Sequence, residues 1–259
     1  MAKFILQSDS NCLDIETVLI KELLHKNKYL HEYKSVDTQC IKDNSYENYI
    51  PIGDINFVTA WLNKNHNIEV ENPIEIPLYL RTDEFLKRDY KIVTWNNIPE
   101  HGSWFLKDIS ILKKFGSVVN TDYENIKDCF NESNNKFDTS LRLDKNHLFQ
   151  VSSIFDIKSE YRVYVIAREI EAISNYNGDT TILPDINLVK KAVNLINYNE
   201  KWLKSYTLDI MVGNKGTAII EVHNFTSVGL YNTLWGSNLL YAYKDGVDYL
   251  INDNKKITI

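Results

Sequence analysis

The stretch YTLDIMVGNKGTAIIEVHNF (residues 206–225) carries two apolar runs on either side of a short turn. A three-residue loop over residues 214–216, with glycine in the left-handed position, is a common connection between antiparallel strands. Residues 206–212 and 217–222 are therefore predicted to form a β-hairpin.

The register of this hairpin brings two acids together. With Gly213 paired to Thr217, counting back from the turn places Asp209 directly opposite Glu221. Opposed side chains lie ~4.5–5.5 Å apart, and like charges there are destabilising. In a half-buried hairpin the two carboxylates need a shared proton or a cation, and oxygen-rich pairs suit magnesium. The alternative is a solvent-facing pair of ordinary exposed acids, and spacing alone does not separate the two.

Two basic residues lie in predicted strands. Lys107 follows three apolar residues and either alternates outward or serves as a phosphate ligand, because lysines are seldom buried without a partner. Arg162 shares a face with Glu160, two residues earlier. The two form either an internal ion pair or a guanidinium held by Glu160 and aimed at a phosphate or carboxylate.

The rest of the chain divides at residues 72–77, where two prolines exclude regular helix. We predict a small α/β domain over residues 1–78 and a second domain over 79–259. The expected helices are an amphipathic one with apolar positions from residue 15 to 24, one that follows Asp54, and one that follows residue 187. Residues 37–49 are predicted to be loop. The further strands are expected at residues 3–7, 50–52, 104–108, 117–119, 148–151, 160–167 and 171–176.

Composition excludes several classes of function. The 259 residues carry a net charge of -6 and no dense basic run, so nucleic acid is not expected as a partner. No apolar run approaches the ~20 residues that span a bilayer, and no signal peptide is recognised, so neither a membrane nor export is expected. The cysteines Cys12, Cys40 and Cys129 give no disulfide or zinc pattern. These features predict a cytoplasmic protein.

In their order along the chain, the motifs resemble a known superfamily. These are WFLKDISILKKFGSVV (104–119), LFQVSSIF (148–155), EYRVYVIAREIEAISNY (160–176) and residues 206–231 with a downstream Gly229-Leu230-Tyr231. Together they resemble the ATP-grasp superfamily, and its small clade named for one arginine and two lysines. The similarity covers roughly residues 50–235 at the scale of a domain.

The resemblance implies an α/β protein with α+β lobes: an ATP-grasp fold with a small N-terminal α/β domain and a hinge near residues 149–153. It implies ATP between the two lobes and magnesium on Asp209 and Glu221. Lys107 and either Lys113 or Lys114 would contact phosphates, and Arg162 would stabilise the transferring γ-phosphoryl group. The remaining nucleotide-binding residues that it implies are Gln150, Val151 and Ser152, which would offer backbone groups of the hinge strand to adenine, and Glu160.

One position departs from the family pattern. The family has asparagine two residues after the metal-binding glutamate, where this chain has His223, and Asn224 follows one residue later. Strict alternation points Asn224 to the other face of the strand. Either His223 lines the metal site or a local bulge brings Asn224 into it.

The reaction implied by the resemblance is an ATP- and Mg²⁺-dependent ligation of a carboxylate to an amine through an acyl phosphate. The partners would be ATP and small-molecule or peptide substrates. Two alternatives stay open: a catalytically weak nucleotide-binding regulatory or interaction protein, favoured by His223, and an ATP-dependent kinase on the same fold. The sequence determines neither the substrates nor the oligomeric state.

Overall fold

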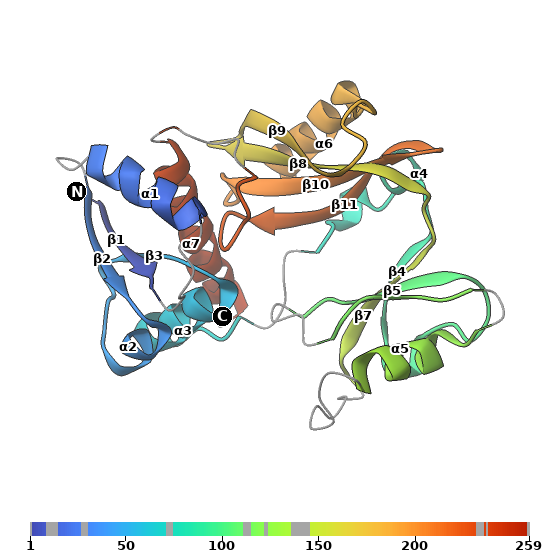
Figure 1. Ribbon diagram of the computed structural model, residues 1–259, viewed down its shortest axis with the longest axis horizontal. Coiled ribbons are helices and arrows are strands. Elements are labelled where there is room, and N and C mark those ends of the chain that lie inside the picture. The colour runs from blue at the N-terminus through green and yellow to red at the C-terminus, as the bar shows by residue number, and fades with distance from the viewer. Residues whose placement is uncertain are drawn as a thin grey trace.

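The computed structural model describes residues 2–8, 15–26, 31–70, 75–110, 115–121, 124–135, 146–231, 236 and 238–257. Within these ranges the chain forms three sheets. Two of them lie one above the other on the right of Figure 1, and the N-terminal sheet lies to their left. The region around residues 72–77 is described only from residue 75 onward, and the division into domains at residue 78 stays a prediction.

The N-terminal sheet is parallel, in the order β2-β1-β3. Its central strand carries Phe4, Ile5 and Leu6, which are fully buried because helices cover both faces. Asp54 caps the helix α3 as predicted, since its carboxylate accepts from the Phe57 N–H at 2.9 Å. The elements are β1 (Ala2–Gln7), α1 (Ile15–Lys26), β2 (His31–Val36), α2 (Thr38–Asp43), β3 (Ile50–Ile52) and α3 (Ile55–His66).

The predicted loop over residues 37–49 was wrong in part. Thr38–Asp43 forms the helix α2, because the Asp37 carboxylate accepts from the Cys40 N–H at 2.6 Å and caps it. The helix packs on α3 through Ile41, which is fully buried. A single buried residue in six carries too little periodicity to predict a helix from sequence.

The second sheet is antiparallel, in the order β4-β7-β5-β6. One face packs on α5 through an aromatic cluster in which Phe130 meets Phe149 edge to face. Strands β5 and β7 confirm the predicted ones. The elements from η1 onward are η1 (Leu78–Leu80), α4 (Asp83–Leu86), β4 (Tyr90–Thr94), η2 (Trp95–Asn97), β5 (Trp104–Asp108), β6 (Val118–Val119), α5 (Ile126–Asn135) and β7 (Leu148–Ser153).

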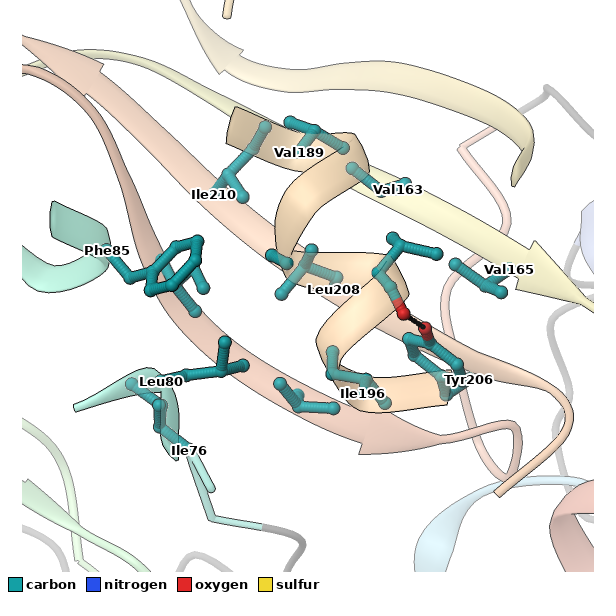
Figure 2. Packing of buried hydrophobic residues seen from close by; sticks show 14 of the residues in the cluster. Ile76, Leu80, Phe85, Val163, Val165, Val189, Ile196, Tyr206, Leu208 and Ile210 are labelled. Carbon is teal, nitrogen blue, oxygen red and sulfur yellow. Dashed lines mark hydrogen bonds between the residues drawn. The ribbon is translucent and has the colours of Figure 1, made fainter. Parts of the chain in front are cut away.

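The third sheet is antiparallel, in the order β11-β10-β8-β9, and α6 covers one of its faces (Figure 1). The apolar residues Val163 and Val165 of β8 point toward Val189 and Ile196 of α6, as Figure 2 shows, which confirms the predicted alternation of β8. The elements are β8 (Ile157–Ile166), β9 (Glu169–Gly178), α6 (Ile186–Asn199), β10 (Tyr206–Gly213) and β11 (Gly216–Asn224).

The chain ends with a helix that the sequence analysis did not predict, α7 (Asn238–Ile257). Its first half packs with Phe4 and Phe225, and its second half with Phe57 and Trp61. The helix therefore lies between the N-terminal sheet and the third sheet (Figure 1). No helix in the described part of the chain, α7 included, is long and apolar enough to cross a bilayer.

Candidate nucleotide and metal site

The β10–β11 hairpin confirms the predicted pairing of the two acids, although its turn differs from the expected one. Gly213 pairs with Gly216 rather than with Thr217, so a regular ladder would place Asp209 opposite Ile220. A β-bulge between Asp209 and the next pair skips Ile220, and Asp209 lies opposite Glu221. The error at the turn is thus cancelled by the bulge.

The bulge also sets which side chains share a face. Ile219 belongs to the core beneath α6, whereas the next residue, Ile220, packs with Phe155 and Met211 on the opposite face. Glu221 is opposite Asp209 and lies on this same face. Two consecutive residues of β11 therefore face the candidate site, one apolar and one acidic.

Arg162 of β8 holds Asp209 with a two-pronged pair of hydrogen bonds. Its Nε donates to Asp209 Oδ1 at 2.8 Å and its Nη2 donates to Oδ2 at 2.7 Å. Burial lowers the pKa of the Arg162 guanidinium, but the hydrogen bonds and charge of Asp209 outweigh burial, so the pKa rises above its ordinary value. The carboxylate partner of Arg162 is thus Asp209, while Glu160 accepts from Asn177 at 3.4 Å.

Glu221 joins the second and third sheets. Lys107 Nζ of β5 donates to Glu221 Oε2, and His223 Nε2 lies 2.8 Å from the other carboxylate oxygen. Lys107 is the register partner of Gln150 on β7, so the Gln150 side chain also lies beside Glu221. The structure therefore resolves the open interpretation of Lys107: the ammonium is half-buried and paired, and does not simply point into solvent.

A cavity of about 280 Å³ opens beside these ion pairs, between the second and third sheets. Phe155, Met211 and Ile220 give it an apolar side. The polar residues that line it are Arg88, Lys107, Gln150, Ser152, Ser153 and Glu160. A largely apolar cleft with a few convergent polar groups is the usual form of a small-molecule site.

Arg88 supports the wall of this cavity, and sequence analysis did not single it out. Its Nη1 donates to the Ile219 carbonyl at 2.8 Å, next to the bulge, and to the Leu86 carbonyl at 3.1 Å. Burial lowers the pKa of the Arg88 guanidinium to about 10, against an opposing effect of Tyr90. The group is still protonated at neutral pH, so a buried positive charge faces the cleft.

Asp108, at the end of β5, is a second residue that the sequence analysis missed. It is 1% exposed and accepts from the Ser110 N–H at 2.7 Å, the Phe115 N–H at 3.0 Å and His147 Nε2 at 2.7 Å. It thereby ties both ends of a connection that includes Lys113 and Lys114. Those two lysines lie outside the described residues, and their roles stay predictions.

The Val151 side chain packs in the core of the second sheet. The role predicted for Val151 is a backbone contact to a nucleotide, and it stays a prediction. Asn224 pairs in register with Tyr206, and its amide oxygen accepts from Thr226 Oγ1 at 2.8 Å. His223 is the residue beside Glu221, but which of His223 and Asn224 would bind a metal stays a prediction.

The residues present fit a magnesium ion shared with a nucleotide. In the described ranges no group of three or more His, Cys, Asp or Glu side chains is placed to hold a metal on its own. Asp209 and Glu221 nevertheless oppose each other on adjacent strands. Magnesium is commonly bound by one or two carboxylates together with substrate phosphates, so two protein carboxylates are an adequate donor set.

Comparison with known proteins identifies the family of the larger part of the chain. Residues 85–236, more than half of the chain, match a family of ATP-grasp domains, the second family of the clade named for one arginine and two lysines. No curated protein sequence matches the chain.

Solved structures share its fold at low sequence identity. D-alanyl-alanine synthetase A from Vibrio cholerae O1 biovar eltor has a TM-score of 0.56 and 11% identity, covering 97% of this chain and 98% of the other. The D-alanine–D-alanine ligase from Bacillus anthracis complexed with ATP has a TM-score of 0.56 and 13% identity, with coverages of 99% and 97%. The ATP-grasp ligase PsnB complexed with a minimal precursor has a TM-score of 0.52 and 14% identity, with coverages of 94% and 99%. By its family match and its fold, this chain belongs to the arginine-and-two-lysines clade of ATP-grasp proteins.

Proposed function

We propose that the protein is an ATP- and Mg²⁺-dependent carboxylate–amine ligase that acts through an acyl phosphate. The observation that carries the proposal is the opposition of Asp209 and Glu221, each paired with a cation suited to phosphate, beside a cavity of about 280 Å³. ATP use is a property of its family neighbours, one of which was solved with ATP. The bond formed and the substrates are our inference.

The nucleotide is proposed to place its base in the cavity between the second and third sheets. The base would lie against Phe155, Met211 and Ile220, with backbone groups of residues 150–152 at its edge. Lys107 would then meet a phosphate, since its side chain lines this cavity and its ammonium pairs with Glu221, one of the two proposed metal ligands. Lys114 or Lys113 would supply the second phosphate lysine.

Asp209 and Glu221 would hold magnesium, with His223 or Asn224 as a further candidate. Bound there, the ion would neutralise phosphate charge during transfer. Because Lys107 is paired with Glu221, this pair must exchange partners when the nucleotide arrives. Lys107 gains a phosphate oxygen and Glu221 gains the metal, so the exchange leaves no charge unpaired. Arg162 keeps its hydrogen bonds to Asp209 and offers its remaining N–H groups to phosphate.

The reaction is proposed to run in two displacements. A substrate carboxylate oxygen attacks the γ-phosphorus, the bond to the β-phosphate oxygen breaks, and ADP leaves. Arg162 stabilises charge on the transferring group, and Lys107 positions the phosphates. The amine then attacks the acyl carbon, inorganic phosphate leaves with the bonding electrons, and the nitrogen loses a proton to water.

The carboxylate and amine substrates are proposed to enter through a second cavity, of about 340 Å³. It lies where β1 and β3 end, and is lined by Gln7, Asp54 and Gly229 among others. Gly229 also contacts Arg162, so this cavity adjoins the proposed site of phosphoryl transfer. Small ligands commonly bind beyond the carboxyl ends of parallel strands. Both small molecules and peptides are candidate substrates for this cavity, since the ATP-grasp ligase PsnB was solved with a minimal precursor.

One observation favours a second function. His223, rather than an asparagine, stands beside Glu221, and imidazole is a poorer magnesium donor than an amide oxygen. A chain of this kind could bind nucleotide without turnover and act as a regulatory or interaction protein. A kinase would use the same site with a different acceptor. We expect a cytoplasmic location for any of these, because nucleotide is supplied there.

The test is calorimetric titration of ATP into the protein with and without magnesium, for the wild type and the Asp209→Asn, Glu221→Gln double variant. We expect magnesium to tighten ATP binding in the wild type and not in the double variant. Asp43→Asn, Glu47→Gln is the matched control, because both acids are exposed and the charge change is the same. A wild type that does not bind ATP would contradict the proposal.

Turnover separates the three functions. ADP release is measured over mixtures of carboxylates and amines. A ligase forms ADP and phosphate only when both substrates are present, a kinase leaves a phosphorylated product with one acceptor, and a binding protein turns over nothing.

A further inference from the structure

Residues 229–231, the Gly-Leu-Tyr segment after β11, surround the arginine of the proposed site. Arg162 Nη1 donates to the Gly229 carbonyl at 3.2 Å. The same carbonyl accepts from Tyr164 Oη at 2.8 Å, and Tyr164 is fully buried. The carbonyl is thus fixed from the core side and defines where one terminal nitrogen of Arg162 lies.

Two tyrosine rings lie against the guanidinium. The Arg162 guanidinium carbon lies 5.0 Å from the centre of the Tyr231 ring and 5.8 Å from that of Tyr176. The two rings stack on each other with centroids 5.1 Å apart and planes 15° apart. Tyr176 also hydrogen-bonds Glu160, and burial raises its pKa, so its ring stays neutral and in place.

The segment adopts a backbone that a tyrosine seldom takes, since Tyr231 has φ of 43°. Its carbonyl accepts from Ser174 Oγ at 3.4 Å, on the strand next to β8. A non-glycine residue in this region persists only where surrounding contacts hold it. The contacts that hold Tyr231 are the ones that bring its ring onto Arg162.

The other side of the segment is tied to the N-terminal domain. The Leu230 N–H donates to Glu16 Oε1 at 2.7 Å, and Glu16 belongs to α1 and lines the second cavity. The Leu230 N–H and the Gly229 carbonyl belong to the same planar peptide group, so Glu16 and Arg162 bind the two polar ends of one amide. Helix α1 therefore contacts the same short segment as the arginine of the third sheet.

We propose that Tyr231 and the Gly229 carbonyl are positioning groups for Arg162, and that Glu16 of α1 holds them in place. The inference rests on the proposed function, because it assigns Arg162 to the γ-phosphate of ATP. In the described part of the chain, Asp209 and Gly229 accept three of the five guanidinium N–H groups, which leaves one on each terminal nitrogen for phosphate oxygens. In this proposal the contact with the Tyr231 ring and the hydrogen bond to the Gly229 carbonyl keep those two N–H groups in position.

The test compares affinities for ATP and ADP, which differ only in the γ-phosphate, by titration with magnesium present. Arg162→Ala is expected to remove the preference for ATP. Tyr231→Ala should lower ATP affinity by roughly fivefold and leave ADP affinity unchanged, from loss of the cation–π contact. Tyr231→Phe keeps the ring and should match the wild type. Tyr231 is 41% exposed, so its truncation leaves the core intact; equal unfolding midpoints in urea check this.

Glu16→Ala is expected to reproduce the loss of ATP preference, and Glu22→Ala, an exposed acid on the same helix, is the matched control. If Arg162→Ala removes the preference but Tyr231→Ala and Glu16→Ala do not, the positioning role is wrong and the proposed function stands. If the wild type binds no ATP, or Arg162→Ala leaves its ATP preference unchanged, the assignment of Arg162 fails and the positioning role falls with it.

Discussion

Asp108 shows how one buried carboxylate can organise the chain beside the proposed phosphate site. Its two oxygens accept from the backbone N–H groups of Ser110 and Phe115, the Ser110 hydroxyl at 2.9 Å, and His147. Ser110 and Phe115 flank the connection that carries Lys113 and Lys114. The carboxylate thus fixes where that connection leaves the second sheet and where it returns.

We predict that Asp108→Asn lowers the free energy of unfolding by roughly 2–3 kcal/mol, because an amide turns a donor toward groups that themselves donate. ATP affinity should fall as well, since the connection with Lys113 and Lys114 loses its anchor. Urea unfolding and titration with ATP measure the two effects. Asp89→Asn is the control, because the Asp89 side chain is exposed. Unchanged ATP affinity in a destabilised Asp108→Asn variant would show that the anchor serves the fold alone.

The β-bulge in the β10–β11 hairpin places two different side chains, Ile220 and Glu221, on the face of the candidate site. A regular ladder from its turn would place Ile220 opposite Asp209, and the bulge instead brings Glu221 there while keeping Ile220 on the same face. The acid then contacts Lys107, and the isoleucine lines the cavity. The Arg88 guanidinium donates to the carbonyl just before the bulge and so supports it from the side.

We predict that Ile220→Ala lowers the affinity for ATP, ADP and AMP by a similar factor, because all three share the base proposed to lie against this side chain. The loss of binding free energy should be about 1.5 kcal/mol, or roughly tenfold in affinity, because methyl and methylene groups are removed from contact with the base. Titration of each nucleotide measures it. Leu183→Ala, at a residue 72% exposed, is the control. A loss confined to ATP would place Ile220 near the phosphates instead.

At the scale of the whole molecule, α7 connects the N-terminal sheet with the third sheet. Gly246 lies at the closest approach, because a Cβ there would come within 2.3 Å of the Phe225 carbonyl oxygen. Phe225 follows β11 directly and precedes the segment that reaches Arg162. The glycine therefore allows the helix to pack against the chain that leads into the site.

We predict that Gly246→Ala destabilises the protein by roughly 1–3 kcal/mol, as expected for overpacking against backbone. The sign of the change in unfolding free energy is informative, because alanine in a helix interior normally stabilises a protein by roughly 1 kcal/mol relative to glycine. A destabilised variant therefore reports the close contact. Urea unfolding measures the change. Lys244→Ala, exposed on the same helix, should stay within about 0.5 kcal/mol of the wild type. A stabilised Gly246→Ala variant would show that the helix packs less closely.

The sequence by itself determined the hairpin strands, the alternation of β8 and the resemblance to the ATP-grasp superfamily. These depend on periodicity and on order along the chain, which are local properties. Only the tertiary structure decided that Arg162 pairs with Asp209, 47 residues away, and Lys107 with Glu221, 114 residues away. It also decided the bulge at Ile220, the helix α7 and the cavity between the sheets, because each depends on which surfaces pack together, and no local pattern encodes that choice.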